Sequence, residues 1–330
     1  MIERAATIRD VARHANVSVA SVSRALNGHD NVHPETRERV MRAAAELHYV
    51  PNAAARSLSS SLTNTIGVVV PDLHGEFFSE LIRGMDAAAG ELGYLLLLST
   101  MHADPALAGQ ALTAMRGRVD GLIVMAPQLP RETIDALMPP TLPGVELICD
   151  ATGKRPAIGI DNRDGAAQAT RHLLATGRRA IAHIMGPPEN FDVRERKAGF
   201  MAAMAEAGVA PVAMAVGDFR EEGGARAVEE LLAPGQPPID AIFAANDMMA
   251  LGALQALRTR GVRVPDDIAV IGFDDIPLAR HLGLSTMRLN VDQIGRSAVN
   301  RLVAMLTTGR IEAEIINQRP ELIIRATTGE

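Results

Sequence analysis

Polar and aromatic side chains follow most of the apolar, strand-length runs of the sequence between residues 65 and 290. In chain order they are Asp72 and Phe77–Phe78, Pro127–Gln128, Asp150, Asn190–Phe191–Asp192, Phe219, Asn246–Asp247 and Phe273–Asp274–Asp275. Ligands of open α/β sheets bind at the carboxyl ends of the strands. We therefore expect these side chains to gather around one ligand-binding cleft.

The residue types at these positions favour a hydroxylated ligand. Of the seven Phe residues, only Phe200 and Phe243 fall well inside an expected helix or strand, so the others offer flat faces near strand ends. Carboxylates and amides suit hydroxyl groups as hydrogen-bond partners. This combination fits a sugar or a sugar-like polyol. Asp and Asn at strand ends are also ordinary turn formers and helix caps, so a structural role stays open for each of them.

The sequence lacks the motifs of several other chemistries. Gly153–Lys154 is followed by Arg155, where a Walker phosphate-binding loop has Ser or Thr, and there is no G-x-G-x-x-G. There is also no G-x-S-x-G nucleophile elbow. His29 and His33 lie in an expected loop without a Cys or His cluster to join them, which argues against a metal site. We therefore expect that the protein is not an enzyme and that it binds neither a metal ion nor another cofactor.

Composition is typical of a soluble globular protein. The 330 residues allow two or three domains, and 47% of them are hydrophobic and 22% charged. The single cysteine, Cys149, excludes a disulfide framework and fits a reducing cytosol. No secretory signal begins the sequence, and apolar runs such as Tyr94–Leu98 are too short to span a membrane. A cytoplasmic protein is expected.

Strands and helices alternate from Thr65 onward. Buried strands are expected at Ile66–Val70, Tyr94–Leu98, Leu122–Val124, Glu146–Cys149, Ile181–Met185, Ala213–Val216, Ala241–Phe243 and Ile268–Ile271. Helices are expected at Phe77–Leu92, Ala106–Arg116, Arg131–Leu137, Arg163–Thr176, Arg194–Ala207, Gly223–Leu232 and Met248–Arg260. Ile158–Ile160 is interpreted as a segment that crosses between two blocks. The two blocks of βα units predict two Rossmann-like parallel sheets with covered faces.

The segment Thr7–Asn27 has the pattern of two short helices joined by a tight turn. Thr7 can cap the first helix and Asp10 can return the bond to complete a capping box, while Ser18 can cap the second helix. The outer face of the second helix would carry Ser21, Ser23 and Arg24. Such a helix-turn-helix offers its second helix to the DNA major groove. The alternative interpretation is a helical hairpin inside a core.

A third helix is expected from Pro34 to about Leu47, with Val40, Ala44 and Leu47 facing inward. Pro34 suits a first helical position, but His33 before it is a poor cap. The following Pro51–Leu62 is too short to form a stable isolated helix, so a plain linker is one interpretation. Eight Arg and six Asp or Glu give residues 1–62 a charge of +2, which leaves −8 for the rest of a total of −6. This modest asymmetry fits a DNA-facing head on an acidic body.

The N-terminal segment closely resembles the lactose-repressor (LacI/GalR) family of bacterial transcription regulators, without a gap. The matching residues are Thr7, Asp10, Val11, Ala12, Val17, Ser18, Val22, Ser23, Arg24, Asn27, Thr36, Arg37, Val40, Leu47, Tyr49, Pro51, Asn52, Ala55 and Leu58. The resemblance continues through the chain and implies an all-α helix-turn-helix domain followed by a two-lobed α/β domain of the periplasmic-binding-protein fold. The chain would cross between the lobes near Asp161, Val291 and Glu321.

The resemblance also implies the domain limits and the DNA contacts. The implied domains are residues 1–50 for DNA binding, 51–63 for a hinge helix, and 64–330 for effector binding and dimerisation, with lobe 1 at about 64–161 and 292–321 and lobe 2 at about 162–291 and 322–330. A homodimer would bind a near-palindromic double-stranded operator, and Leu58 of each hinge would wedge into the minor groove. The expected DNA-binding residues are Thr7, Ser18, Val19, Ala20, Ser21, Ser23, Arg24, Asn27, Tyr49, Asn52, Ala55 and Leu58.

Three motifs of the family imply effector contacts. Arg196 in RKAGF would reach the effector from the first turn of its helix, and Asp274 in IGFDD would contact it too. In NDMMALG, Asn246 would face the effector and Asp247 would cap the helix. With the strand-end residues, the expected effector-binding set is Asp72, Phe77, Gln128, Asp150, Phe191, Asp192, Arg196, Asn246, Phe273 and Asp274.

These features predict a cytoplasmic, nucleoid-associated repressor of carbohydrate genes that a neutral sugar or polyol releases from DNA. A purine-type corepressor in place of the sugar remains an alternative. A solute-binding protein of the same fold is a second alternative, and the DNA-binding head argues against it. An enzyme that uses the cleft is a third, disfavoured by the absent catalytic motifs.

Overall fold

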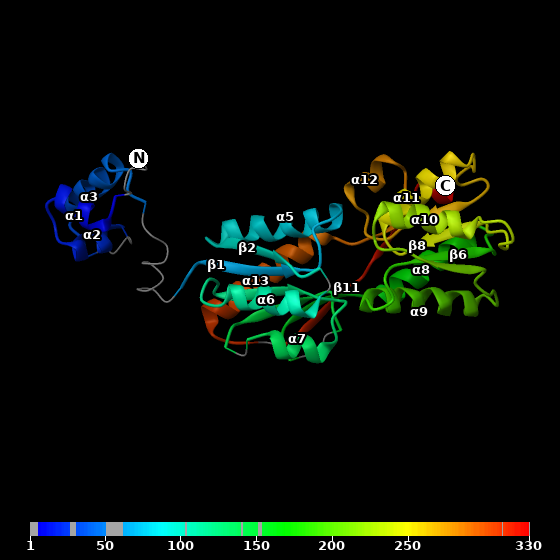
Figure 1. Ribbon diagram of the computed structural model, residues 1–330, viewed down its shortest axis with the longest axis horizontal. Coiled ribbons are helices and arrows are strands. Elements are labelled where there is room, and N and C mark those ends of the chain that lie inside the picture. Colours follow the sequence, from blue (N-terminus) through cyan, green and yellow to red (C-terminus); the bar gives the residue numbers. More distant parts are fainter. Residues whose placement is uncertain are drawn as a thin grey trace. The chain divides into compact units, whose positions relative to one another are not determined.

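The computed structural model describes residues 6–26, 31–50, 62–102, 104–139, 141–150, 154–311 and 313–329. The chain divides into two compact units, Met1–Thr63 and Asn64–Glu330, and each is described by itself (Figure 1). Within the described ranges, none of the helices is long and apolar enough to cross a membrane.

The described residues of the first unit form three helices, α1 (Ile8–His14), α2 (Val19–Leu26) and α3 (Pro34–Glu46). Its core consists of Val11, Ala12, Ala15, Val22, Ala25, Val40, Ala43 and Ala44. The predicted capping box is present in α1, where the Thr7 amide donates to Asp10 Oδ2 at 2.9 Å and the Asp10 amide donates back to Thr7 Oγ1. Ser18 Oγ accepts from the Ser21 amide at 3.1 Å and so caps α2, while no side-chain bond caps α3 at His33.

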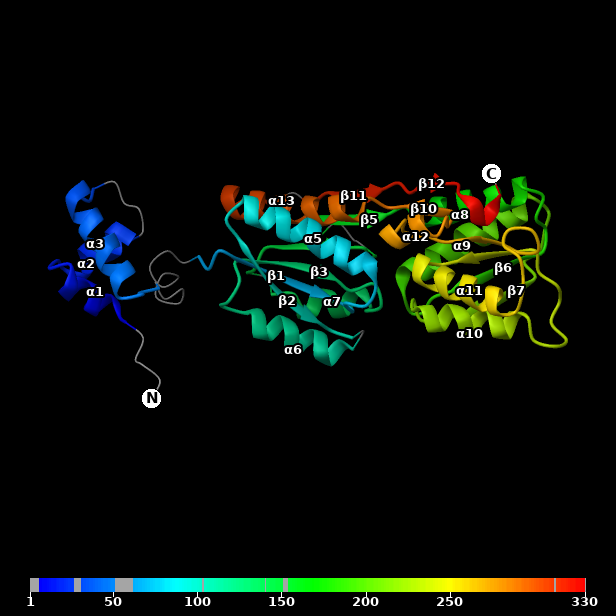
Figure 2. The same ribbon diagram turned by 90° about the horizontal axis from the view of Figure 1, so that it is seen from above.

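Lobe 1 of the second unit is built on a parallel sheet in the order β11-β5-β4-β3-β1-β2. Its strands are β1 (Thr65–Val70), β2 (Leu95–Thr100), β3 (Gly121–Met125), β4 (Gly144–Leu147), β5 (Ala157–Ile160) and β11 (Ile315–Gln318). One face is covered by α5 (Glu76–Glu91) and α13 (Val291–Thr308), the other by α6 (Pro105–Met115) and α7 (Arg131–Leu137) (Figure 2). The alternation in β1 accounts for both faces, since Val68 and Val70 pack with α5 and Val69 packs with α6.

Lobe 2 is built on a parallel sheet in the order β7-β6-β8-β9 and on an antiparallel pair, β10 with β12. The strands are β6 (Ile181–Met185), β7 (Ala213–Val216), β8 (Ala241–Ala244), β9 (Ala269–Ile271), β10 (Thr286–Arg288) and β12 (Glu321–Ile323). The covering helices are α8 (Asn162–Ala175) with α9 (Phe191–Glu206) on one face and α10 (Glu221–Leu231) with α11 (Asp247–Thr259) on the other. Two short elements, α12 (Pro277–His281) and a 3-10 helix (Ala326–Thr328), complete this lobe.

The predicted strands and helices lie close to those observed, with two differences that matter for the site. Ile158–Ile160 is not a crossing segment but belongs to β5, which pairs with both β4 and β11 inside the first sheet. Helix α9 begins at Phe191 rather than at Arg194, because Asn190 Oδ1 accepts two amide hydrogens of its first turn. Asp192 and Arg196 are therefore carried by one rigid helix.

Candidate functional site

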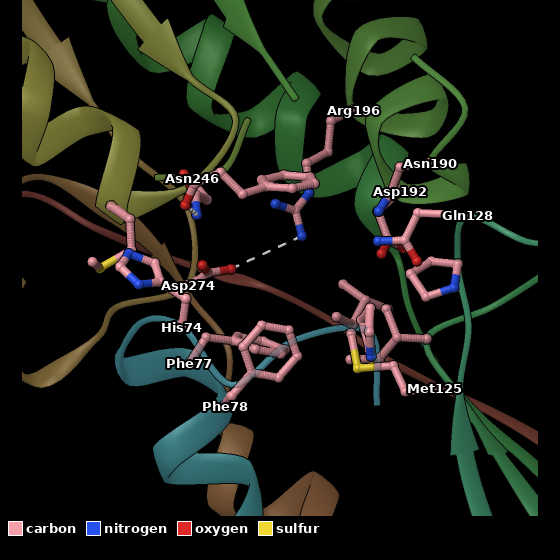
Figure 3. Close-up of a pocket in the computed structure, with 16 residues that line it drawn as sticks. His74, Phe77, Phe78, Met125, Gln128, Asn190, Asp192, Arg196, Asn246 and Asp274 are labelled. Atoms are coloured by element: carbon pink, nitrogen blue, oxygen red, sulfur yellow. Dashed lines mark hydrogen bonds and ion pairs between the residues drawn. The ribbon is translucent and has the colours of Figure 1, made fainter. Parts of the chain in front are cut away.

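A cavity lies between the two lobes, bordered by residues that follow strands of both parallel sheets (Figure 3). It has about 600 Å³ of atom-free space, including the part open to solvent, which is in the range of small-molecule sites. Its lining residues are Pro71, His74, Phe77, Phe78, Met125, Pro127, Gln128, Ile148 and Ile160 from lobe 1, and Asn190, Asp192, Arg196, Phe219, Asn246, Met248 and Asp274 from lobe 2. The lobe 1 wall is mainly apolar and the lobe 2 wall mainly polar, so a ligand meets two different surfaces.

Arg196 is held on three sides by lobe 2. It lies in the second turn of α9, one turn later than predicted. Its Nε donates to Asn162 Oδ1 at 2.7 Å, its Nη1 donates to the Ala245 carbonyl, and its Cζ lies 3.9 Å from the centre of the Phe273 ring. Nη2 faces Asp274, whose Oδ1 is 3.9 Å away (Figure 3). The arginine therefore offers a fixed donor to the cavity.

Asp192 is buried beside this arginine at the start of α9. Its Oδ1 accepts from Asn162 Nδ2 at 2.7 Å, so Asn162 joins the carboxylate to the guanidinium group of Arg196. Burial raises the pKa of Asp192 to about 6, although the charge of Arg196 opposes that shift. The network requires a close approach of α8 and α9, because a Cβ atom on Gly199 would lie 2.0 Å from the Arg163 carbonyl oxygen.

Asp274 follows β9 and is only 4% exposed. Among the described residues no hydrogen bond reaches its carboxylate, and its one ion pair is the long contact to Arg196. Burial raises the pKa of Asp274 to about 7. Backbone hydrogen bonds to Met287 and Leu289 hold it at a φ of 122°, which is uncommon for a residue with a side chain. Its carboxylate is thus placed to accept hydrogen bonds from a ligand.

Asn246 and Asp247 differ from the roles expected for them. Asn246 caps α11, because its Oδ1 accepts from the Met249 amide at 3.0 Å, and its Nδ2 donates to the Phe219 carbonyl at 3.1 Å. Asp247 does not cap the helix: it is fully buried and accepts from the Thr286 hydroxyl at 2.6 Å and from a backbone amide of the loop after β9. The expected capping role of Asp247 was therefore wrong. Asn246 lines the cavity, but its amide group is already engaged.

Three phenylalanines border the cavity. Phe77 and Phe78 lie in the first turn of α5 with ring centres 5.4 Å apart and nearly perpendicular planes, and Phe219 comes from the loop after β7. Such rings can cover an apolar or flat part of a ligand. Gln128 contributes a side-chain amide to the lobe 1 wall. Its Oε1 is excluded from solvent and has no hydrogen-bond partner in the described part of the chain.

Four expected effector residues lie outside this cavity. Asp72 forms an ion pair across the lobes at the surface. Asp150 and Phe191 border a neighbouring cavity instead. Phe273 is fully buried beneath the guanidinium group and supports it from behind. A strand-end position fixes the edge of the sheet but not the direction of the following loop, so the structure does not place these four residues on the cavity wall, and their contact with an effector stays a prediction.

The other six expected effector residues do line the cavity, namely Phe77, Gln128, Asp192, Arg196, Asn246 and Asp274. Asn162, His74 and Met248 were not expected. Asn162 comes two residues after β5, so the strand-end rule would have found it if Ile158–Ile160 had been assigned to a strand. For His74 and Met248 the sequence gives no distinguishing signal. In the described part of the chain, no group of three or more His, Cys, Asp or Glu side chains could hold a metal ion.

Contacts on opposite sides of the cavity join the two lobes. They are Asp72 with Arg220 at 2.7 Å, His74 with Glu221 at 3.0 Å, the Leu278 amide with Glu76 at 2.8 Å, and the Phe191 amide with the Pro127 carbonyl at 2.9 Å. The cleft is therefore closed in this structure.

Helix α2 of the N-terminal head exposes side chains that are small and mainly uncharged. The expected DNA contacts that are exposed are Ser18, Val19, Ala20 and Arg24, and those that are partly exposed are Thr7, Ser21, Ser23 and Tyr49. The Thr7 hydroxyl is taken up by the capping box, and Tyr49 packs against the core of the head. Four further expected contacts, Asn27, Asn52, Ala55 and Leu58, lie outside the described residues.

The described part of the head has three helices, and the second one is exposed. Two α/β lobes with parallel sheets follow and enclose a ligand-sized cavity. This combination defines a ligand-responsive DNA-binding regulator. Residues 7–52 match the bacterial regulatory proteins of the lacI family, and residues 170–328 match a periplasmic binding protein-like domain.

Similar proteins agree with that class. The chain is 34% identical over 325 residues to the ribose operon repressor of Halalkalibacterium halodurans, which covers 98% of this chain and 97% of the relative. It is 37% identical over 335 residues to the HTH-type transcriptional repressor PurR of Erwinia tasmaniensis, with 98% and 97% covered. The crystal structure of the lac repressor dimer bound to operator and the anti-inducer ONPF aligns with a TM-score of 0.90 and 29% identity, over 99% of this chain and 100% of that one. The chain belongs to the lacI family of bacterial regulatory proteins, which confirms the resemblance seen in its N-terminal motif.

Proposed function

We propose that the protein is a homodimeric repressor of carbohydrate uptake or catabolism genes, released from its operator by a neutral sugar or related polyol. Residues 1–50 bind DNA, residues 51–63 form the hinge, and residues 64–330 bind the effector and dimerise. The protein acts in the cytoplasm on nucleoid DNA and has no enzymatic activity.

The effector class rests on the balance of unpaired polar groups on the lobe 2 wall. Asp274 offers a carboxylate without hydrogen bonds, Asp192 offers its second oxygen, and Arg196 offers Nη2. On this wall hydrogen-bond acceptors outnumber donors, and the carboxyl groups of Asp192 and Asp274 already lie beside the guanidinium group of Arg196. A neutral molecule with several hydroxyl groups satisfies this set, whereas an anion would have to compete with the acids for the guanidinium group.

A purine-type corepressor is the second candidate, and the aromatic rings favour it. Phe77, Phe78 and Phe219 could stack on a flat base as well as cover the apolar face of a sugar ring. The excess of acceptors on the lobe 2 wall favours the sugar, because a polyol donates more hydrogen bonds than a base.

DNA recognition is assigned to the exposed face of α2. Val19 is 42% exposed and, with Ala20, can contact a thymine methyl group but cannot hydrogen-bond a base edge. Arg24 donates from Nε to the Ala20 carbonyl, and its terminal N–H groups can pair with a guanine. Leu58 of the hinge enters the minor groove at the operator centre and kinks the duplex.

A second copy of the chain is proposed to cover the free edge of lobe 1. The edge strand there is β2, and it carries exposed leucines at Leu95, Leu97 and Leu98. An unpaired edge strand with apolar side chains favours association unless another surface covers it. The lac repressor to which this chain is similar is a dimer, which supports a second copy as the occupant.

The effector acts by favouring one of two lobe arrangements. A ligand that contacts both walls of the cavity stabilises the closed cleft, and the shift of lobe 1 changes the spacing of the two hinges on DNA. In this proposal, the cross-lobe contacts of Asp72 and His74 break when the cleft opens.

A thermal-shift screen of the full-length protein tests the effector class. The panel contains neutral sugars, sugar phosphates, nucleosides and bases. We expect a neutral sugar to raise the Tm and to weaken binding to DNA selected from a random-sequence library, measured by mobility shift. A base that raises the Tm and strengthens DNA binding would establish the corepressor instead. Stabilisation by sugar phosphates alone would contradict the argument for a neutral ligand.

A further inference from the structure

The loop after β9 holds two consecutive residues in a left-handed backbone conformation. Asp274 has a φ of 122° and Asp275 has a φ of 57°. Residues with a side chain rarely adopt such angles, and two in a row persist only where surrounding contacts hold them. Because this loop presents the Asp274 carboxylate to the effector cavity, the contacts that hold the loop also set the direction of that carboxylate.

The side chain of Asp275 makes the strongest of these contacts and does not border the effector cavity. It is 3% exposed and borders a neighbouring cavity instead. Its Oδ2 accepts from Arg288 Nε at 2.7 Å, and its Oδ1 accepts from Arg325 Nη2 at 2.6 Å. Both carboxylate oxygens are therefore engaged by arginines of the fold.

The two arginines are themselves fixed by lobe 2. Arg288 belongs to β10, and Arg325 follows β12, the strand that pairs with β10. The Nη1 of Arg325 donates to the Leu284 carbonyl at 2.7 Å, and its backbone amide donates to Ser285 Oγ at 2.8 Å. Hydrogen bonds between charged groups are stronger than neutral ones. The strained loop is thus anchored on a pair of hydrogen-bonded strands.

We propose that Asp275 is a positioning residue for effector binding, which holds the Asp274 carboxylate toward the effector through its own bonds to Arg288 and Arg325. The proposal rests on the effector site proposed above and adds a residue that does not touch the effector. Without the Asp275 carboxylate, the loop loses two charge-assisted bonds and its backbone relaxes toward ordinary angles. The Asp274 carboxylate then leaves its place and accepts less well from the effector.

A role of Asp275 in stability alone predicts a different behaviour. Asp275→Asn would then lower the free energy of unfolding, and the folded variant would bind the effector as the wild type does. Under the proposal, the variant loses affinity, and the loss requires Asp274 because Asp275 acts through it. A double-mutant cycle with Asp274→Ala separates the two roles, because the effects of two residues that act through one contact do not add.

The first measurement needs no effector. Amide hydrogen exchange of the full-length protein, followed by mass spectrometry, compares the wild type with Asp275→Asn. The amides of Asp274 and Leu289 report on the loop, because they donate to the carbonyls of Met287 and Asp274. We expect both amides to exchange about tenfold faster in the variant, while the amides of α9 keep their protection. An equal increase in α9 and in the loop would mean general destabilisation and would overturn the inference.

The second measurement is calorimetric binding of D-ribose, D-xylose, D-glucose and D-galactose, at millimolar sugar for the weaker variants. We expect Asp275→Asn to weaken binding of the tightest sugar about tenfold in the wild-type background and less than about twofold in the Asp274→Ala background. The matched control is Asp267→Asn, because Asp267 also pairs with an arginine, Arg263, but at the surface of lobe 2. This control should change neither sugar binding nor exchange in the loop.

Arg288→Met covers the case in which Asp275→Asn fails to fold. It removes one of the two bonds to Asp275 and should give the same pattern with an effect of about threefold. Sugar binding by Asp275→Asn within about twofold of wild type overturns the inference, as does an equal loss in both backgrounds of the cycle. If none of the sugars binds the wild type, the proposed effector class fails, and the exchange measurement still decides whether Asp275 positions Asp274.

Discussion

Replacement of Arg196 by alanine is expected to lower the free energy of unfolding by about 3–5 kcal/mol and to abolish the effector response. The side chain is 4% exposed, donates to Asn162 and to the Ala245 carbonyl, and covers the Phe273 ring. Removal of one member of a buried charged network leaves the others uncompensated, which typically costs about 3–5 kcal/mol. Because domains are stable by only about 5–15 kcal/mol, a loss of this size is easily measured.

The protonation of two buried acids determines how large the loss of unfolding free energy is within that range. Burial already raises the pKa of Asp192 to about 6 and that of Asp274 to about 7. Without the arginine their pKa values rise further, so both acids bind protons near neutral pH and relieve part of the charge imbalance. We therefore expect a loss near 3 kcal/mol at pH 6 and a larger one at pH 8.

Urea denaturation followed by circular dichroism measures the loss, and two variants control it. Arg171→Ala removes a 49% exposed arginine of the same lobe, paired with Glu206, and should cost about 0–1 kcal/mol. Arg196→Lys keeps a charge but lacks the fork that bonds Asn162 and the Ala245 carbonyl together, so it should fall between wild type and the alanine variant.

The functional readout is operator binding with and without effector. Folded Arg196→Ala should bind operator within a few fold of wild type but should not release it at effector concentrations that saturate the wild type. A variant that loses stability and still responds would show that Arg196 only ties lobe 2 together. A loss of stability no larger than that of Arg171→Ala would refute the network argument itself.

Three further predictions concern DNA and pH. Arg24→Ala should cost about 1–3 kcal/mol in operator affinity and relax the preference at one position per half-site, and equal weakening on random DNA in fluorescence anisotropy would make it a phosphate contact. Leu58→Ser should leave the dimer and effector affinity intact but abolish operator bending, and unchanged bending in a gel phasing assay contradicts the wedge. Since burial raises the pKa of Asp274 from 3.8 to about 7, the folded protein binds more protons than the unfolded chain in that window, and the free energy of unfolding falls as pH rises through it. Asp274→Asn should flatten this slope in denaturation titrations, and an unaltered slope would assign it to other groups.

The strands could be predicted because most of them are buried apolar runs bounded by turn residues. Ile181–Met185 and Ala213–Val216 have the predicted limits. Ala157–Ile160 was not recognised as a strand of the sheet, because four residues with a central glycine carry little pattern of their own. Its place is decided by β4 and by β11, which comes from Ile315–Gln318, and pairing with so distant a segment leaves no local signal.

The candidate site was predictable to the extent that strand ends meet at one edge of a sheet. That rule brings Asp192 and Asp274 to the cavity, but it cannot say that Phe273 points beneath the guanidinium group and away from the ligand. Asn246 and Asp247 are both good capping residues, so the local sequence does not choose between them. The Thr286 hydroxyl, from a distant strand, binds Asp247 and leaves Asn246 to cap the helix.

The two walls of the cavity contribute differently to the affinity for the effector and to the conformational response. Arg196 and its partner Asn162 both belong to lobe 2, so a rigid-body movement of the two lobes would leave their geometry unchanged. A ligand shifts an equilibrium only by its differential affinity for the two states, and contacts available in both states contribute nothing to that difference. The lobe 1 wall, with Phe77, Phe78 and Gln128, can touch a ligand on lobe 2 only after closure. Lobe 2 contacts should therefore contribute to effector affinity alone, whereas lobe 1 contacts should contribute both to affinity and to the shift of the protein on DNA.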